Sequence, residues 1–123
     1  MGLEEGADVV MRQLRSKAGR EERRTFYTDA AQKGGESGIA VVQGNTGKII
    51  TRKRLPRWAA GDSTVAELIA IEAALAHQAK KRPRPPNTII ATDSKQAIRQ
   101  ILEGTSPHGQ YVVRYIRKHI DSL

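Results

Sequence analysis

Three acidic residues, Asp29, Glu67 and Asp93, are the candidates in this sequence for a catalytic or metal-binding role. Asp29 interrupts "TFYTDAA", a stretch that otherwise alternates like a β-strand, where aspartate is disfavoured because its charge needs water or a partner. Carboxylates held close together repel, which raises their pKa values unless a cation neutralises them. Their hard oxygen atoms suit Mg²⁺ or Mn²⁺, and a pair of such ions can align water with a phosphodiester. The three acids are therefore candidate ligands of a metal site that hydrolyses phosphodiesters.

Two of these acids also have a purely structural interpretation. Glu67 closes the sequence "TVAE", which can form a capping box at the start of a helix. Asp93 opens "DSKQ", which can be an N-cap with a glutamine three residues later. Asp29 is not followed by a helix, and the two glycines of "KGGESG" already provide the turn residues after it. Only the three acids together favour a catalytic role.

The elements that must position the acids follow from the hydrophobic pattern. Strands and turns predict an antiparallel meander, then a long helix, a buried strand and two more helices, over 25–31, 38–44, 48–55, 63–81, 87–93, 94–104 and 110–123. A helix between the third and fourth strands implies a crossover to a parallel strand. We therefore expect an α/β fold, a mixed sheet of three antiparallel strands and a parallel strand with flanking helices.

This arrangement explains how acids far apart in the sequence can meet. If the strands at 25–31 and 87–93 are adjacent and parallel, their carboxyl ends share the edge of the sheet where ligands usually bind. The first turn of the helix at 63–81 can cross the same corner. The helices are expected to pack through apolar stripes at Val65, Leu68, Ile69, Leu75 and Ala76, at Ala97, Ile98, Ile101 and Leu102, and at Tyr111, Val112, Tyr115, Ile116 and Ile120.

Composition narrows the class of partner. The 123 residues carry a net charge of +8 and no cysteine, which excludes disulfides and thiolate metal sites. Residues 37–61 contain no acid but hold a basic cluster that includes Arg52, Lys53 and Arg54, and residues 73–92 are similar. Clustered positive charge suits a phosphate backbone, although exposed loops can carry it for solubility alone.

Without a membrane-length apolar run or a signal region, we expect an intracellular protein, nuclear or cytoplasmic. Residues 1–24 are expected to form a flexible or partly helical leader before a domain over 25–123.

The ordered set "YTDAA", "GIAVV", "AELIAIEAAL" and "ATDSKQAI" resembles the type 1 ribonuclease H family over residues 25–123. Within this family, the sequence is most similar to the RNase H domains of reverse transcriptases from non-LTR retroelements. The resemblance implies an RNase H-like fold and an endonuclease that cleaves the RNA strand of RNA–DNA hybrids with two Mg²⁺ ions. Asp29, Glu67 and Asp93 then match three of the four carboxylates of the family. Ser94 falls where the family often has a serine, and the basic strand residues Arg52, Lys53 and Arg54 would hold backbone phosphates.

The sequence departs from the family at its C-terminal end. The family continues with a fifth strand and a final helix that carries the fourth aspartate, whereas this sequence ends at "HIDSL". Asp121 precedes the place of that strand and is not a candidate for the fourth acid. We therefore expect a C-terminally truncated domain whose fourth strand is an exposed apolar edge, unless another polypeptide completes it.

Two functions remain open on this basis. One is the hybrid-specific endonuclease, and the other is a catalytically weak or inactive nucleic-acid-binding remnant of a retroelement. A protein-contact scaffold on the same sheet is a third interpretation, but it leaves the three acids unexplained. Among the other titratable residues, Glu72 is ranked below Glu67 because it lies further from the helix start, and His108 and His119 are interpreted as ordinary loop and helix residues.

Overall fold

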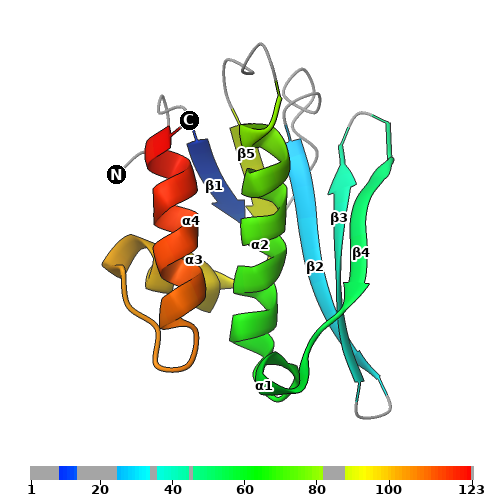
Figure 1. Cartoon of the computed structure of the whole chain (residues 1–123). Coiled ribbons are helices and arrows are strands. Elements are labelled where there is room, and N and C mark those ends of the chain that lie inside the picture. Colours follow the sequence, from blue (N-terminus) through cyan, green and yellow to red (C-terminus); the bar gives the residue numbers. More distant parts are fainter. Residues whose placement is uncertain (1–8, 14–24, 34–35, 45, 82–87, 123) are drawn as a thin grey trace.

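Figure 1 shows the computed structural model, which describes residues 9–13, 25–33, 36–44, 46–81 and 88–122. Its elements in chain order are β1 (Val9–Gln13), β2 (Thr25–Lys33), β3 (Glu36–Gln43), β4 (Ile49–Arg54), α1 (Arg57–Ala60), α2 (Ser63–Ala79), β5 (Thr88–Thr92), α3 (Lys95–Glu103) and α4 (Gln110–Ser122). No helix in these ranges is both long and apolar enough to cross a membrane.

The described strands form one sheet in the order β1-β5-β2-β3-β4. β2, β3 and β4 pair antiparallel as a meander, and β5 returns through α2 to pair parallel with β2. The predicted fold class, a mixed α/β sheet with three antiparallel strands and a parallel strand after a helical crossover, is confirmed. Gly47 supports the turn between β3 and β4, because its φ of 68° lies in the left-handed region that favours glycine.

The far edge of the sheet differs from the prediction. β1 lies parallel beside β5, in register from Val9 opposite Thr88 to Gln13 opposite Thr92. Residues 9–13, expected as part of a flexible or partly helical leader, therefore form a strand; the rest of 1–24 lies outside the described residues. The expectation that the strand at 87–93 is an exposed edge is wrong, since β1 covers β5. The absence of a C-terminal fifth strand and final helix stays a prediction. All five residues of β5 are buried.

The pairing of β1 with β5 gives a first prediction. Successive backbone N–H groups of a strand point to opposite sides, so the double substitution Val10→Pro/Met11→Pro must remove one donor of this ladder. We expect the free energy of unfolding to fall by at least about 2 kcal/mol, measured by urea denaturation. The control Val10→Ile/Met11→Leu keeps both donors and should unfold near the wild-type midpoint. Equal midpoints for all three proteins would show that β1 is not part of the folded sheet.

The helices pack on one face of the sheet, which we call the helix face. α2 and α4 lie side by side across it in Figure 1. The main core cluster joins this face to α2, α3 and α4 and consists of Phe26, Val41, Leu68, Ile71, Ala74, Leu75, Ile90, Ala97, Ile101, Val112, Val113, Ile116 and Ile120. A smaller cluster under α1 contains Ile39, Leu55, Ala59, Val65, Ala66 and Ala70. Burial on this scale stabilises the fold by roughly 25 cal/mol for each Å² of apolar surface removed from water.

The three predicted apolar stripes are only partly correct. In α3, Ala97 and Ile101 are fully buried, whereas Leu102 is 53% exposed. In α2, Ile71 and Ala74 are fully buried, whereas Ile69 is half-buried. The helix contacts both the sheet and α4, so its buried surface is wider than a single stripe. In α4, Tyr111 and Tyr115 are 64% and 41% exposed and do not belong to the core. A tyrosine can leave the core in this way because its hydroxyl favours water.

Candidate functional site

The candidate site lies where β2 and β5 diverge. The two strands pair only from Thr25 opposite Ile89 to Tyr27 opposite Ala91, and β2 then continues to Lys33 with β3 alone. Asp29 therefore stands on β2 just beyond the last pair, and Asp93 directly follows β5. Both aspartates are exposed. The divergence lies at the carboxyl ends of two parallel strands, the position where open α/β sheets usually bind ligands.

Glu67 from the first turns of α2 occupies this divergence. Its Oε1 accepts a hydrogen bond from the backbone N–H of Ala30 at 3.1 Å, and its Oε2 accepts one from the hydroxyl of Thr92 at 3.5 Å. The same Thr92 hydroxyl oxygen accepts the N–H of Ser94 at 3.1 Å. Glu67 is only 8% exposed. One buried carboxylate thus joins α2, β2 and the end of β5.

The structure rejects the two capping interpretations of the acids. The N-cap of α2 is Asp62, whose Oδ1 accepts the N–H groups of Thr64 and Val65 at 2.9 and 3.1 Å. Glu67 is therefore not part of a capping box. The N-cap of α3 is Ser94, whose Oγ accepts the N–H of Ala97 at 3.1 Å. Neither Glu67 nor Asp93 is needed to start its helix, so each acid requires another explanation.

The two aspartates act electrostatically on Glu67. The pKa of Glu67 is raised from its ordinary value of 4.5 to about 7, first by burial and then by repulsion from the Asp93 carboxylate. Asp29 raises the pKa of Glu67 as well, while the hydrogen bonds from Ala30 and Thr92 lower it. Two aspartates from separate elements therefore lie within electrostatic reach of Glu67.

The carboxylates of Asp29, Glu67 and Asp93 are chemically suited to a divalent cation, but they are not arranged to bind one. Carboxylate oxygens are hard ligands of the kind Mg²⁺ and Mn²⁺ prefer, and a cation would relieve the repulsion that raises the pKa of Glu67. In the part of the chain that the structure describes, however, no group of three or more His, Cys, Asp or Glu side chains is gathered closely enough to hold a metal ion. The carboxylates surround one corner without forming a coordination sphere.

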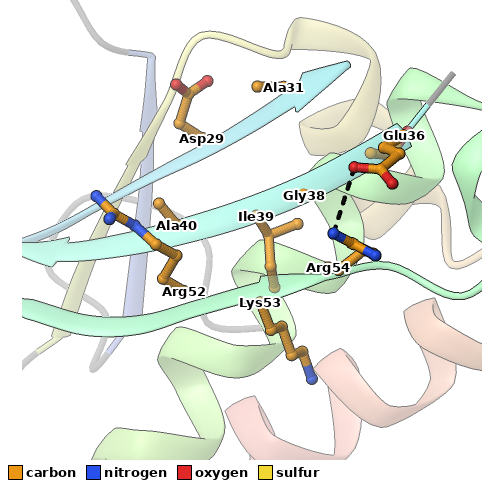
Figure 2. Close-up of a pocket in the computed structure, with 10 residues that line it drawn as sticks. Asp29, Ala31, Glu36, Gly38, Ile39, Ala40, Arg52, Lys53 and Arg54 are labelled. Atoms are coloured by element: carbon orange, nitrogen blue, oxygen red, sulfur yellow. Dashed lines mark ion pairs between the residues drawn. The ribbon is translucent and has the colours of Figure 1, made fainter. Parts of the chain in front are cut away.

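The structure separates the three basic residues predicted to bind nucleic acid. Arg52 is in register with Ala40, which is in register with Asp29, so these residues share the face opposite the helices, which we call the Asp29 face. Figure 2 shows them on that side, with Lys53 on the other side beside Ile39. Lys53 therefore lies on the helix face. Ser94, also predicted to contact nucleic acid, is engaged as the N-cap of α3.

A groove of about 360 Å³ lies along β2, β3 and β4 next to Asp29. Arg54 lines it and forms an ion pair with Glu36, with 3.4 Å between Nη2 and Oε2. Glu36 and Thr92 were not among the residues predicted from the sequence. Thr92 could have been found as the polar residue that ends an apolar strand, whereas nothing in the sequence places Glu36 beside Arg54.

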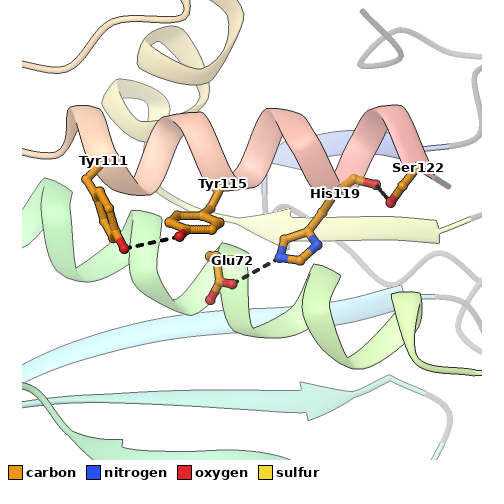
Figure 3. A network of polar contacts seen from close by, with 5 residues as sticks. All are labelled: Glu72, Tyr111, Tyr115, His119 and Ser122. Carbon is orange, nitrogen blue, oxygen red and sulfur yellow. Dashed lines mark hydrogen bonds and ion pairs between the residues drawn. The ribbon is translucent and has the colours of Figure 1, made fainter.

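The other acid weighed in the sequence analysis, Glu72, lies elsewhere. Figure 3 shows it on the helix face, where its Oε1 is 3.1 Å from Nε2 of His119 and joins α2 to α4. Beside this pair, the hydroxyls of Tyr111 and Tyr115 lie 3.1 Å apart and their rings meet edge to face. Glu72 and His119 thus serve helix packing, away from the corner that holds Glu67.

Comparison with known proteins supports the fold. No protein-family model matches the chain, and no curated protein matches its sequence. Among solved structures, the chain is similar to RNase H1 from the halophilic archaeon Halobacterium salinarum, with 21% identity and a TM-score of 0.56. The match covers 80% of this chain and 77% of that one. The chain therefore has an RNase H-like α/β fold.

Proposed function

We propose that this protein is an endonuclease that cleaves the RNA strand of RNA–DNA hybrids. Its catalytic residues would be Asp29, Glu67 and Asp93. One observation carries the proposal: a buried glutamate that caps no helix has a pKa raised to about 7, in part by two aspartates from other elements. Such a perturbed carboxylate at the carboxyl ends of two parallel strands is typical of a functional site. The RNase H-like fold supports the choice of reaction.

The three carboxylates would hold Mg²⁺ or Mn²⁺, two ions by the family resemblance. When bound, these ions would polarise the phosphate and activate a water molecule. The chain itself fixes Glu67 in place through the Ala30 N–H and the Thr92 hydroxyl, so the carboxylate keeps one orientation. β3 holds Asp29 through register with Ala40, which leaves the Asp29 carboxylate exposed to substrate.

The hybrid would be recognised by its 2′-hydroxyls and groove shape rather than by its base sequence. The net charge of +8 favours its phosphate backbone. We infer as well that the domain derives from a retroelement reverse transcriptase, on the "SGIAVV" strand and the "QYVVRYIRKHID" helix. The second candidate, a nucleic-acid-binding remnant without activity, is favoured by the described carboxylates not being gathered into a coordination group.

The experiment that tests the proposal compares four labelled substrates of one sequence: hybrid, RNA duplex, DNA duplex and single-stranded RNA. Each is incubated with the protein in Mg²⁺, in Mn²⁺ and in EDTA. We expect cuts in the RNA strand of the hybrid alone, and only with a divalent cation. Hybrid binding without any cleavage would support the remnant. Cleavage in EDTA, or equal cleavage of single-stranded RNA, would contradict the proposal.

A further inference from the structure

The register of the meander aligns acidic and basic residues in rows on the Asp29 face. Asp29, Ala40 and Arg52 form one cross-strand row, and Ala31, Gly38 and Arg54 form the next. Neighbouring strands lie about 4.8 Å apart, so the backbones of Asp29 and Arg52 are separated by roughly 10 Å. A nucleic-acid strand of two or three nucleotides covers such a distance. A phosphate at Asp29 would therefore have a neighbour within reach of Arg52.

The surface of the groove between Asp29 and the two arginines is formed by small residues. Ala31, Gly38 and Ala40 line the groove of about 360 Å³, and their side chains are small or missing, so a ligand can come close to the sheet. Gly38 has a second reason to be small, because a Cβ there would meet the backbone oxygen of Lys53 at 3.3 Å. The helices of the described part lie on the other face.

The two arginines of the groove differ in their partners. Arg54 pairs with Glu36 at 3.4 Å, and the two side chains are 74% and 61% exposed, so the ion pair is weak and can exchange its partner. Among the described residues, no acidic side chain forms an ion pair with Arg52, which is exposed. An arginine prefers the planar, bidentate contact that a phosphate offers.

We propose that the backbone of the hybrid lies in this groove on the Asp29 face, where Arg52 binds a phosphate and Glu36 competes with phosphate for Arg54. The proposal rests on the proposed function for the identity of the ligand, and it assigns the path of that ligand over β2, β3 and β4. Lys53 also lines the groove, but its side chain points to the helix face, on the side of Ile39 and away from this path. Glu36 weakens binding because a phosphate must displace it from Arg54.

The test measures binding of a labelled RNA–DNA hybrid in EDTA, where cleavage does not interfere, at several salt concentrations. Arg52→Ala and its neighbour Lys53→Ala remove the same charge from opposite faces of β4. We expect Arg52→Ala to weaken binding about 5- to 10-fold near 0.1 M salt and to reduce the slope of log K against log[salt] by about 1. Lys53→Ala should leave the affinity within about twofold of wild type and the salt slope unchanged.

Glu36→Gln is the opposite test, because it keeps the size of the side chain and releases Arg54. We expect this variant to bind the hybrid more tightly, by about 3- to 10-fold, and to show a steeper salt slope. Equal losses for Arg52→Ala and Lys53→Ala would overturn the path, since only total charge would then matter. Weaker binding by Glu36→Gln would overturn the competition for Arg54.

The outcomes separate this inference from the proposed function. A hybrid that binds through Arg52 but is never cut leaves the path standing and rejects the nuclease. If Arg52→Ala cuts the hybrid at the wild-type rate and binds it as tightly as wild type does, the proposed nuclease activity stands and the proposed path is rejected. A wild-type protein that does not bind the hybrid at low salt rejects the path directly.

Discussion

Asp29→Asn is expected to abolish hybrid cleavage while leaving the fold and hybrid binding intact. The side chain is exposed, and its backbone stays paired with Ala40, so the substitution removes one negative charge and little packing. Loss of one ligand charge from a site that stabilises the transition state should lower the cleavage rate at least about 100-fold. The rate is measured on end-labelled hybrid in Mg²⁺, beside binding of the same hybrid in EDTA.

The matched control is Asp62→Asn. Asp62 also lies near the start of α2, but its carboxylate caps the helix, and asparagine caps equally well. The control should cleave the hybrid at the wild-type rate. Wild-type cleavage by Asp29→Asn would contradict the role of Asp29. Loss of both cleavage and thermal stability would show that the residue matters to folding instead.

Glu67→Gln should separate stability from activity, since it removes a charge that the fold holds at a cost. The pKa of Glu67 is about 7 in the folded protein against an ordinary 4.5, so the folded state holds this proton more tightly than the unfolded state. The stability that this group contributes is full below pH 4.5 and is lost as pH rises through 7. Glutamine does not titrate. At pH 8 the variant should be more stable than wild type, by on the order of 2 kcal/mol.

The measurement is urea unfolding of both proteins at pH 5 and pH 8 without divalent cations. The two proteins should differ little at pH 5 and diverge at pH 8, where the wild type loses stability and the variant does not. The variant should also lose hybrid cleavage, because its amide carries no charge for a cation. A variant that is less stable than wild type at both pH values would show that the carboxylate is a structural group and not a strained one.

Adding Mg²⁺ should bring the two proteins together at pH 8. A cation that binds the folded site stabilises it by mass action, and only the wild type keeps the full set of carboxylates. We expect millimolar Mg²⁺ to raise the melting temperature of wild type by a few degrees and that of Glu67→Gln by much less. Equal shifts in the two proteins would indicate that Mg²⁺ acts on the surface in general.

Much of the site followed from the sequence because its parts obey local rules. A lone aspartate in an alternating strand, a glutamate in the first turns of a helix and an aspartate after a buried strand could be assigned without coordinates. The parallel pairing of β2 and β5 followed from the helix between them. What these rules could not decide was whether Glu67 and Asp93 were caps, because capping and metal binding use the same residue types. Asp62 and Ser94 resolved this in the structure.

The features that the sequence did not predict depend on contacts between residues far apart in the chain. β1 is five residues long and pairs with a strand near the other end of the chain, so no hydrophobic period identifies it. The division of Arg52 from Lys53 depends on the register of β4 with β3, and a shift of one residue would exchange their faces. A charge run in a sequence therefore predicts a basic strand but not which face of the sheet carries each charge.

The central claim is that Glu67 lies in a cluster of carboxylates that a divalent cation neutralises, and its titration tests this directly. The chemical shift of the Glu67 carboxyl carbon is followed by NMR from pH 4 to pH 9, with and without Mg²⁺. We expect a pKa of about 7 without the cation, and a clearly lower pKa with it. Asp93→Asn should also lower it, whereas Asp62→Asn should not. An ordinary carboxyl pKa without Mg²⁺, or a raised one that Mg²⁺ leaves unchanged, would contradict the account.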